Sequence, residues 1–317
     1  MSKAIIIGHT GQDGTYLWQL LRSKNYDLIG ISNHKTTSTQ TGDKEAMDIR
    51  DTKSVGEVVK SFQPDEIYYL AAVHQSSSDN QMEEGELFQK SIDINVKAFI
   101  NFLEAVRLYS KHSKIFYAAS SHIFGDTTSP IQDETTPLNP NCIYGITKTT
   151  GIRACRFYHN NYNIFASVGI FYNHESPLRA SKYVSKKIVE TAVAIKRGLK
   201  DNLILGNLDH RVDWGYAPDY VDAAYRILQL KQADNFIISS GVTHSIKDFT
   251  EGVFIYLGLD WSKYVTIDPN LITKKQKQNL TGNNQKLKKA TGWENSVTFS
   301  GLIKILVDAE LEKHAAK

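Results

Sequence analysis

Short apolar runs alternate with amphipathic segments along the first half of the chain. Five of the apolar runs have the length and composition of buried strands: residues 4–7, 27–31, 64–72, 115–118 and 164–170. Between them, apolar residues recur at helical spacing in three segments: residues 15–23, 55–62 and 93–110. Strands that alternate with helices favour a parallel sheet with helices on both faces. The pattern therefore predicts an α/β fold built on a doubly wound parallel sheet.

The regular alternation weakens after residue 170. The strand at 164–170 runs into a polar cluster at 171–177, and the ends of parallel strands are where ligands commonly bind. We predict a helix from about residue 183 to 197 and a short strand at 203–207, while the remainder mixes helices with loops. At 317 residues, the chain is long enough for one large α/β domain or for a large and a small lobe.

Composition and charge narrow the class of protein. The chain is 41% hydrophobic and 22% charged, and its formal net charge of +3 is too small to indicate a nucleic-acid partner. Its two cysteines, Cys142 and Cys155, form neither a disulfide framework nor a set of metal ligands, which fits a reducing cytoplasm. We expect no signal peptide ahead of the first strand, and no apolar run approaches the length of a membrane span. These features predict a cytoplasmic globular protein with no metal, nucleic acid or membrane as partner.

A glycine-rich loop follows the first predicted strand. It reads Gly8-His9-Thr10-Gly11-Gln12-Asp13-Gly14, with the spacing G-x-x-G-x-x-G. Glycines at this spacing permit a tight turn and a close approach of the backbone, and the N-terminus of the next helix then faces a pyrophosphate. The alternative is a glycine turn without a ligand. The loop predicts a dinucleotide site whose cofactor contacts include Gly8, Thr10, Gly11, Gln12, Asp13 and Gly14.

The end of the second strand is where such a site reads the adenosine ribose. An acidic residue there favours NAD and an arginine favours NADP, but the chain has Ser32-Asn33-His34-Lys35. Asn33 and Lys35 are the predicted contacts, and the choice between NAD and NADP stays open. Asp48 either accepts from the adenine amino group or belongs to the N-cap region of the next helix. The remaining predicted cofactor contacts are Ile49, Leu70, Ala71 and Ala72.

Two hydroxyls and a lysine carry the candidate chemistry. The strand at 115–118 leads to Ser120, and Tyr144 and Lys148 have the spacing Tyr-x-x-x-Lys. In a helix the last two side chains lie one turn apart, and the ammonium group would lower the pKa of the phenol. A tyrosine tuned in this way can take the proton of an alcohol that becomes a ketone. The motif alone is weak, because it also fits an ordinary surface helix, but the dinucleotide site upstream supports it.

Together these residues resemble an extended short-chain dehydrogenase/reductase, and in particular the GDP-mannose 4,6-dehydratases. The glycine loop with its Gln-Asp pair is similar to that of the family. Later segments are similar too: residues 173–177, 205–209, 213–215, 268–269 and 292–293. The resemblance covers nearly the whole chain and implies a Rossmann domain at 1–170. It also implies a mostly nucleotide-sugar-binding lobe at 171–317, with the chain crossing back to the Rossmann sheet. An NAD or NADP cofactor, a GDP-sugar substrate and a homodimer or homotetramer follow from the same resemblance.

The resemblance implies roles for individual residues. Ser120, Tyr144 and Lys148 take the positions of the catalytic serine or threonine, tyrosine and lysine, and the last two also contact the cofactor. The implied substrate contacts are Ser121, Asn173, Val184, Lys187 and Arg211. Arg211 lies one residue early, because Val212 occupies the position of the diphosphate arginine. Arg153 and Arg156 fall on the helix that the family commonly places in a dimer interface.

The departures from the family concern the elimination step. Where the dehydratases carry a glutamate that removes the sugar C5 proton, this chain has His122. A neutral imidazole can act as a base, but it is bulkier than a carboxylate, and a misplacement of about 1 Å can cost on the order of a hundredfold in rate. The alternative for His122 is a packed histidine at the strand end, bonded to the loop. Two family arginines are replaced by Asn33 and His34, and a late Arg-Pro by Thr273-Lys274.

The sequence therefore favours an enzyme that performs NAD(P)-dependent redox at C4 of a GDP-hexose or GDP-heptose, as a dehydrogenase or a 4-keto reductase. A GDP-mannose-type 4,6-dehydratase with His122 as the base is the alternative. An epimerase or a non-catalytic nucleotide-binding relative is more distant. Two further segments stay open: residues 73–84 can border the sugar pocket, and the lysine-rich span 273–289 is either a solvated face or a diphosphate contact.

Overall fold

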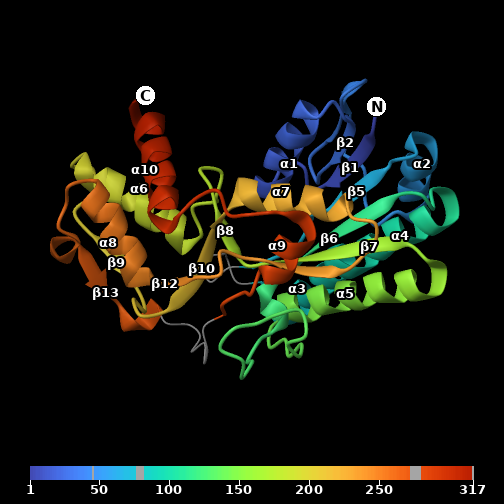
Figure 1. Cartoon of the computed structure of the whole chain (residues 1–317). Helices are drawn as coiled ribbons and strands as arrows, with labels where there is room; N and C mark the ends of the chain where they lie inside the picture. Colours follow the sequence, from blue (N-terminus) through green and yellow to red (C-terminus); the bar gives the residue numbers. More distant parts are fainter. Residues whose placement is uncertain (45, 76–81, 272–279, 316–317) are drawn as a thin grey trace.

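The computed structural model of the chain describes residues 1–44, 46–75, 82–271 and 280–315, and it centres on an eight-stranded sheet (Figure 1). The strands of this sheet are β1 (Lys3–Ile7), β2 (Asp27–Ile31), β3 (Thr36–Ser38), β4 (Gly42–Lys44), β5 (Glu66–Tyr69), β6 (Lys114–Ser120), β7 (Phe165–Phe171) and β11 (Asn235–Ile238). Neighbours are parallel in the order β11-β7-β6-β5-β1-β2, and the hairpin of β3 and β4 extends the sheet with antiparallel strands.

Helices cover both faces of the sheet, because its central strands are buried on both sides (Figure 1). On β1, Ile5 and Ile7 belong to one hydrophobic core, whereas Ala4 and Ile6 belong to a second. The helices α2 (Thr52–Phe62), α4 (Ala98–Tyr109) and α5 (Ile143–Tyr162) pack on the first core, and α1 (Gln12–Ser23) and α7 (Ala217–Leu228) pack on the second. Since successive side chains of a strand point to opposite faces, a doubly covered strand requires an unbroken apolar run. The predicted α/β fold with a doubly wound parallel sheet is confirmed.

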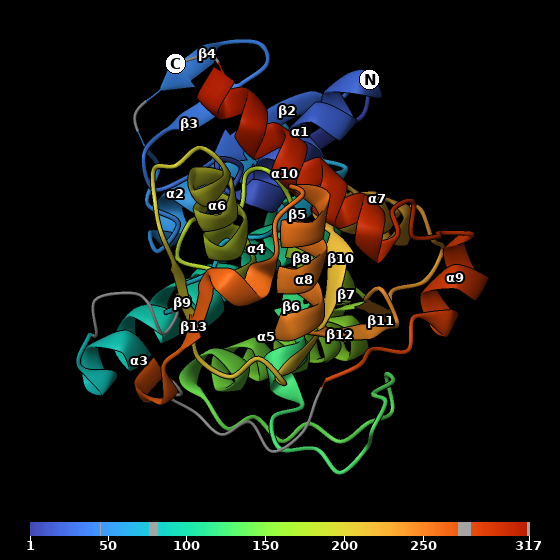
Figure 2. The same ribbon diagram turned by 90° about the vertical axis from the view of Figure 1, so that its left-hand side faces the viewer.

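A smaller lobe lies beside the sheet and has its own core (Figures 1 and 2). Its helices are α6 (Val184–Lys196), α8 (Ile246–Tyr256) and α10 (Phe299–Ala315). Its strands form two short sheets: β12 (Thr243–Ser245), β10 (Arg211–Tyr216) and β8 (Asn173–Glu175) in one, and β13 (Val265–Ile267) and β9 (Leu203–Leu205) in the other. Between these elements the chain returns to the large sheet through α7, β11 and α9 (Gln285–Thr291). Residues from three separated parts of the sequence therefore build each lobe.

Four features of the fold differ from the sequence prediction. The last third of the chain contains the strands β11, β12 and β13, where only helices and loops are predicted. Helix α1 begins at Gln12 rather than at residue 15, because Gly11 forms its N-cap in an extended conformation. The long helix begins well before residue 93, since α3 (Glu84–Ile92) and a π-helical turn (Asp93–Lys97) lead directly into α4. The strands β3 and β4 are short and polar, so no apolar alternation indicates them. Thr273-Lys274 and parts of the spans 73–84 and 273–289 lie outside the described residues.

Candidate active site

The glycine loop connects β1 to α1 and is tightly packed against its own backbone. Gly8 has a φ of +90°, which favours glycine. A Cβ on Gly8 would lie 2.9 Å from the backbone nitrogen of Ala71, and a Cβ on Gly14 would lie 2.2 Å from the Gly8 carbonyl oxygen. Thr10 and Gly11 are exposed on the loop, where a ligand can reach them. This close-packed loop at a helix N-terminus fits the pyrophosphate of a dinucleotide.

The end of β2 forms a short turn where the ribose site is predicted. The Ser32 hydroxyl donates to the Lys35 carbonyl at 3.0 Å and accepts from the Lys35 N–H at 3.1 Å, while Asn33 between them is exposed. Two other predicted cofactor contacts follow β5, where Leu70 is half-buried and Ala72 is exposed. The turn thus presents an amide and an ammonium group, and it leaves the choice between NAD and NADP open.

Asp48 lies in neither a core nor a helix cap. Its carboxylate accepts from Arg50 Nε at 2.9 Å and from Arg50 Nη2 at 2.8 Å, and the pair is exposed. The N-cap of α2 is Asp51, which accepts from two backbone N–H groups of its own helix, so the N-cap alternative for Asp48 is wrong. Ile49 is 9% exposed and packs into the core. Contacts of Asp48 and Ile49 with adenosine stay a prediction.

Strand β6 and helix α5 deliver the predicted catalytic residues. Ser120 ends β6 and is 8% exposed. Lys148 is 1% exposed, and its Nζ donates to the Ala118 carbonyl of β6 at 2.7 Å and lies 5.6 Å from the ring centre of Tyr144. Tyr144 is partly buried and stands one turn before Lys148 on α5. The lysine therefore links the helix to the strand and places its ammonium group beside the phenol ring.

Burial changes the protonation of both groups. It raises the pKa of Tyr144, an effect that the positive charge of Arg179 partly opposes, and it lowers the pKa of Lys148 to about 7. Both shifts have one cause, since a low dielectric disfavours the charged form of an acid and of a base alike. The expectation that Lys148 lowers the pKa of Tyr144 therefore does not hold for the chain alone. At neutral pH the phenol is protonated and the lysine is close to its titration midpoint.

The burial of Lys148 predicts a pH dependence of stability. Its pKa is about 7 in the folded state against about 10.5 in the unfolded chain, so between these values the unfolded state binds more protons. The free energy of unfolding should therefore rise from pH 7 to pH 8.5, with about 1–2 kcal/mol contributed by this group. Urea unfolding measures the rise, and Lys148→Met should remove that contribution. The range ends at pH 8.5 because Cys155, whose pKa burial raises, acts in the opposite direction at higher pH. An identical pH dependence in the variant would contradict the assignment.

Two histidines lie beside Tyr144. Its ring centre is 5.8 Å from that of His122, in the 3₁₀ turn after β6, and 4.7 Å from that of His74. The side chain of His122 is exposed, and its Nδ1 lies 3.7 Å from Cys142 Sγ. Cys142 is the N-cap of α5, where its sulfur accepts from the Gly145 N–H at 3.4 Å. His122 is therefore accessible to a ligand rather than packed at the strand end, and its contact with the cap of α5 orients its ring.

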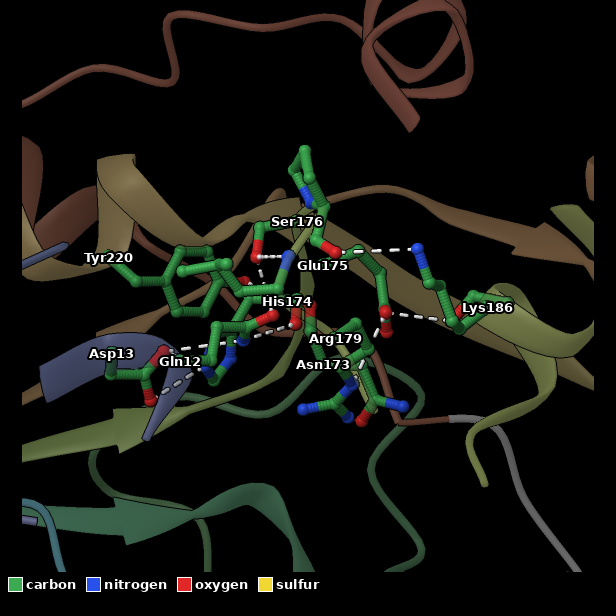
Figure 3. A network of polar contacts seen from close by, with 12 residues as sticks. Gln12, Asp13, Asn173, His174, Glu175, Ser176, Arg179, Lys186 and Tyr220 are labelled. Atoms are coloured by element: carbon green, nitrogen blue, oxygen red, sulfur yellow. Dashed lines mark hydrogen bonds and ion pairs between the residues drawn. The ribbon is translucent and has the colours of Figure 1, made fainter. Parts of the chain in front are cut away.

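Gln12 and Asp13, at the start of α1, bond to strand β8 (Figure 3). The Asp13 carboxylate contacts His174 Nε2 at 2.9 Å and 3.0 Å, and Gln12 Nε2 donates to the His174 carbonyl at 3.2 Å. Gln12 Oε1 also accepts from the Ser176 hydroxyl at 2.8 Å. Burial alone would raise the pKa of Asp13, but His174 and Arg179 outweigh it and hold the pKa below its usual value. The helix behind the glycine loop is thus bonded to the strand that opens the smaller lobe.

Asp13→Ala should lower the free energy of unfolding by about 3 kcal/mol, because it leaves the largely buried His174 without its carboxylate. Asp48→Ala is the matched control, since it removes an exposed carboxylate whose pair with Arg50 is screened by solvent and contributes little to stability. Urea titrations at pH 7 compare the two. The difference should vanish as the pH falls below about 4, because a carboxyl with a lowered pKa stabilises the fold only while it is ionised. Equal losses of the free energy of unfolding in the two variants at pH 7 would argue against a stabilising contact between Asp13 and His174.

A second set of charged residues follows on the same strand (Figure 3). Glu175 is 1% exposed, accepts from the Ser185 hydroxyl at 2.7 Å and pairs with Arg179 Nε at 3.2 Å. Lys186 of α6 pairs with Glu310 of α10 at 2.9 Å, and both side chains are buried. Buried charges require such partners. The network therefore fixes the beginning of α6 relative to β8, and it places Arg179 close enough to influence both Asp13 and Tyr144.

The predicted substrate contacts are spread over several elements. Val184 is the first residue of α6 and is 37% exposed, and Lys187 donates through Nζ to a backbone carbonyl of β9 at 2.8 Å. Arg211, at the start of β10, donates to a backbone carbonyl of β12 at 2.7 Å. Asn173 is exposed at the start of β8, whereas Ser121 is 3% exposed. Both cations have protein partners here, and their contact with a diphosphate stays a prediction.

The comparison with known sequences places this site in a family. Over residues 5–306, the chain matches the sequence model of the family described as GDP-mannose 4,6 dehydratase. The chain belongs to this family. The relative "GDP-mannose 4,6 dehydratase 2" of Arabidopsis thaliana is 35% identical, over 98% of this chain and 87% of the relative. The "GDP-mannose 4,6 dehydratase" of Homo sapiens is 29% identical, over 98% of this chain and 91% of the relative. The resemblance seen in the sequence is thereby confirmed.

Solved structures of distant relatives share the fold. RMD from Pseudomonas aeruginosa, complexed with NADPH, has a TM-score of 0.82 at 19% identity, over 99% of this chain and 100% of that chain. The dTDP-glucose 4,6-dehydratase of Bacillus anthracis, in complex with NAD, has a TM-score of 0.81 at 18% identity, over 99% of this chain and 98% of that chain. At such identities the likeness concerns the fold alone, and it confirms the Rossmann-type prediction for this dehydratase-family chain. Among the described residues, no helix is long and apolar enough to cross a membrane, and no group of three or more His, Cys, Asp or Glu side chains could hold a metal ion.

Proposed function

We propose that the protein is a 4,6-dehydratase that acts on GDP-mannose or on a similar GDP-hexose or GDP-heptose. The observation that carries the proposal is the position of Tyr144 between buried Lys148 and exposed His122, in a chain that belongs to the dehydratase family. The sequence pattern alone favoured simple redox at C4, as a dehydrogenase or a 4-keto reductase. The family match supports the dehydratase alternative instead, because its members named as dehydratases align with nearly the whole chain.

An NAD or NADP cofactor is part of this proposal. Gly8, Gly11 and Gly14 would let the backbone and the N-terminus of α1 approach the pyrophosphate, and Asn33 and Lys35 would hold the adenosine ribose. The chemistry that a bound nicotinamide would supply is reversible hydride transfer, with the hydride of sugar C4 returned within the same turnover. The turn at Asn33 carries no acid, so both cofactors are compatible with the proposal.

The side chains at the end of β6 and the start of α5 would handle the proton of the C4 oxidation. Tyr144 accepts the proton of the C4 hydroxyl, and Ser120 hydrogen-bonds the same oxygen and orients it. Burial raises the pKa of Tyr144, so the phenolate needs a cation nearby. Lys148 lies beside the ring and titrates near neutral pH, so it can hold the positive charge that stabilises the phenolate.

Elimination of water needs a base at C5, and we assign this role to His122. A ketone at C4 acidifies the C5–H bond, so an imidazole can remove that proton to give the enolate. The enolate then returns its electron pair to form the C5–C6 double bond as the C6–O bond breaks. The Nδ1 atom of His122 faces Cys142 Sγ at 3.7 Å, which assigns the exchange with the sugar to Nε2. The ring centres of His122 and Tyr144 are 5.8 Å apart. A sugar whose C4 hydroxyl contacts the phenol would therefore have its C5 within reach of His122.

The product formed from GDP-mannose tests the proposal. A product that has lost one water molecule, without net formation or consumption of NADH or NADPH, is the expected result. Stoichiometric conversion of the nicotinamide with no loss of water would support the oxidoreductase and overturn the dehydratase. A product of unchanged mass with an inverted carbon would support an epimerase. Mass spectrometry of the sugar nucleotide and absorbance of the reduced nicotinamide distinguish these outcomes.

His122→Glu should raise the rate of dehydration by about tenfold or more, because it restores a carboxylate where a misplaced base can cost on the order of a hundredfold. His122→Gln should lower the same rate. His112→Glu, which changes an exposed histidine in the loop between α4 and β6, is the control and should leave the rate unchanged. Initial rates of product formation measure all three. A folded His122→Glu variant without any gain would show that the replaced carboxylate does not limit the reaction.

We also infer a homodimer or homotetramer that assembles through α5. Three apolar side chains are exposed along this helix, with Phe157 at 52%, Tyr162 at 43% and Ile146 at 39%. Arg153 and Arg156 are exposed on the same helix. An apolar stripe flanked by charged residues is typical of an interface between protein chains. Such an interface would bury the back of the helix that carries Tyr144 and Lys148.

A further inference from the structure

We propose that His74 is a second proton-transfer residue of the site and protonates the hydroxyl that leaves sugar C6. His74 belongs to the loop after β5, and neither the glycine loop nor the Tyr-x-x-x-Lys motif points to it. The proposal rests on the proposed dehydratase function, since only an elimination requires a proton at the C6 oxygen. It assigns separate residues to the removal of the C5 proton and to the departure of water.

The rings of His74, His122 and Tyr144 form a triangle. The ring centres are 4.7 Å apart for His74 and Tyr144, 5.8 Å for His122 and Tyr144, and 6.0 Å for the two histidines. The three pairs meet at interplanar angles of 78°, 79° and 65°. C5 and C6 of a hexose lie one and two bonds from C4. A sugar with its C4 hydroxyl at Tyr144 therefore has C5 and C6 within reach of the two imidazoles.

The backbone before His74 is held by a buried amide. Asn95, in the π-helical turn, is fully buried, and its side chain accepts from the Val73 N–H at 2.8 Å and donates to the Val73 carbonyl at 3.2 Å. The same amide donates to the Thr147 hydroxyl of α5 at 3.0 Å. One side chain thus ties the loop of His74 to the helix that carries Tyr144. This arrangement sets the position of the imidazole relative to the phenol, as proton transfer requires.

The smaller lobe holds the imidazole from another direction. The ring of Tyr183, the N-cap residue of α6, is stacked on that of His74 with centres 6.2 Å apart and an interplanar angle of 18°. The guanidinium carbon of Arg179 lies 3.5 Å from the centre of the Tyr183 ring, and Glu175 fixes that arginine. His74 therefore bridges the two lobes, between Tyr144 on one side of the site and Tyr183 on the other. A nucleotide sugar bound between the lobes would meet it.

The elimination leaves one proton transfer without a residue unless His74 supplies it. His122 takes the C5 proton, and the electron pair of the C5–H bond enters the enolate of the C4 ketone. As the C4 carbonyl forms again, that pair forms the C5–C6 double bond and the C6–O bond breaks. The departing oxygen then needs a proton to leave as water. Tyr144 serves the C4 oxygen, and His122 can return its proton only if it moves from C5 to the C6 oxygen. An imidazolium at His74 donates the proton directly and becomes neutral, and solvent restores it after release of the product.

Two readouts in D₂O with GDP-mannose test this assignment. The first is the rate of dehydration, and the second is deuterium incorporation at C5 of recovered sugar, which reports the C4 oxidation and the C5 base together. His74→Phe retains a ring for the contacts with Tyr144 and Tyr183 and removes the proton. It should slow dehydration by about 10²-fold or more while C5 exchange stays within about threefold of the unmodified protein. His122→Gln is the matched control and should lose both signals.

The rates of dehydration and of C5 exchange together decide whether the His74 assignment, the proposed dehydratase function, or both are wrong. Dehydration within threefold of the unmodified protein in folded His74→Phe would overturn the assignment. So would a parallel loss of dehydration and C5 exchange in His74→Phe and in His74→Gln, since a residue that only supports the site moves both signals. If the unmodified protein exchanges C5 or oxidises C4 but never loses water, the proposed dehydratase function fails, and the role of His74 fails with it. A dehydrating protein with an unaffected His74→Phe variant overturns the His74 assignment alone.

Discussion

Tyr144→Phe is expected to lower turnover of the nucleotide sugar by about 10²–10⁴-fold, the range that the loss of a general acid–base group produces. The phenyl ring keeps the contacts with His74, His122 and Lys148, so the site should keep its shape. The variant loses only the hydroxyl that takes the C4 proton, and binding of the sugar nucleotide should change little. Steady-state rates measure turnover, and calorimetric titration of GDP-mannose measures binding.

Tyr158→Phe is the matched control because it makes the same chemical change farther along α5. The Tyr158 hydroxyl donates to Glu104, outside the site, so its loss should cost about 1 kcal/mol of stability and leave turnover within about twofold. A Tyr144→Phe variant that keeps more than a tenth of the activity would remove Tyr144 from the proton path. A variant that loses binding and turnover in equal measure would point to positioning of the sugar.

Gly14→Ala is expected to weaken dinucleotide binding about tenfold or more and to destabilise the fold. The new Cβ would lie 2.2 Å from the Gly8 carbonyl oxygen and 2.5 Å from the His9 Cα, and both are backbone atoms. Overpacking of this kind forces the backbone to shift and typically lowers the free energy of unfolding by about 1–3 kcal/mol. It would also move the loop from the pyrophosphate, and each 1.4 kcal/mol lost there weakens binding about tenfold. Fluorescence titration with NADH and NADPH measures the affinity, and urea unfolding measures the stability.

Gly85→Ala separates the effect of the site from that of a helical glycine. Gly85 lies near the start of α3, and a Cβ there would meet no atom within 4 Å. Alanine favours a helix by about 1 kcal/mol over glycine, so this variant should be equally stable or more stable and should bind the dinucleotide normally. Normal affinity in a folded Gly14→Ala variant would show that the loop does not approach the cofactor as its packing indicates.

Five strands of the large sheet, β1, β2, β5, β6 and β7, were predictable because they are apolar on both faces. A run such as Ala4 to Ile7 needs cover on both sides, and the helices that provide it show periodic apolar positions. The π-helical turn at Asp93–Lys97 has no such signature, since its conformation depends on the burial of Asn95 against Val73. The short strands of the smaller lobe were only partly indicated, because three-residue strands carry too few positions for an alternation to be recognised.

The candidate site likewise contains residues that the sequence pattern indicates and residues that it does not. Tyr144 and Lys148 follow from a spacing of four within one helix, and Ser120 follows from the end of a strand. His74 and Arg179 come from loops, and they reach Tyr144 only through contacts between distant segments. The protonation of Lys148 was also beyond the sequence pattern, because the pattern gives the distance between the two groups but not their burial.

The ion pair between Lys186 and Glu310 joins residues that are 124 positions apart in the chain. A ribosome releases the N-terminal part of a protein first, and domains begin to fold as they emerge. The glycine loop and β6 can therefore take shape on the nascent chain long before α10 appears. Until then, the charge of Lys186 has to stay in water, and the beginning of α6 lacks its anchor. During synthesis, the glycine loop and β6 can thus form early, whereas the contact that anchors α6 forms late.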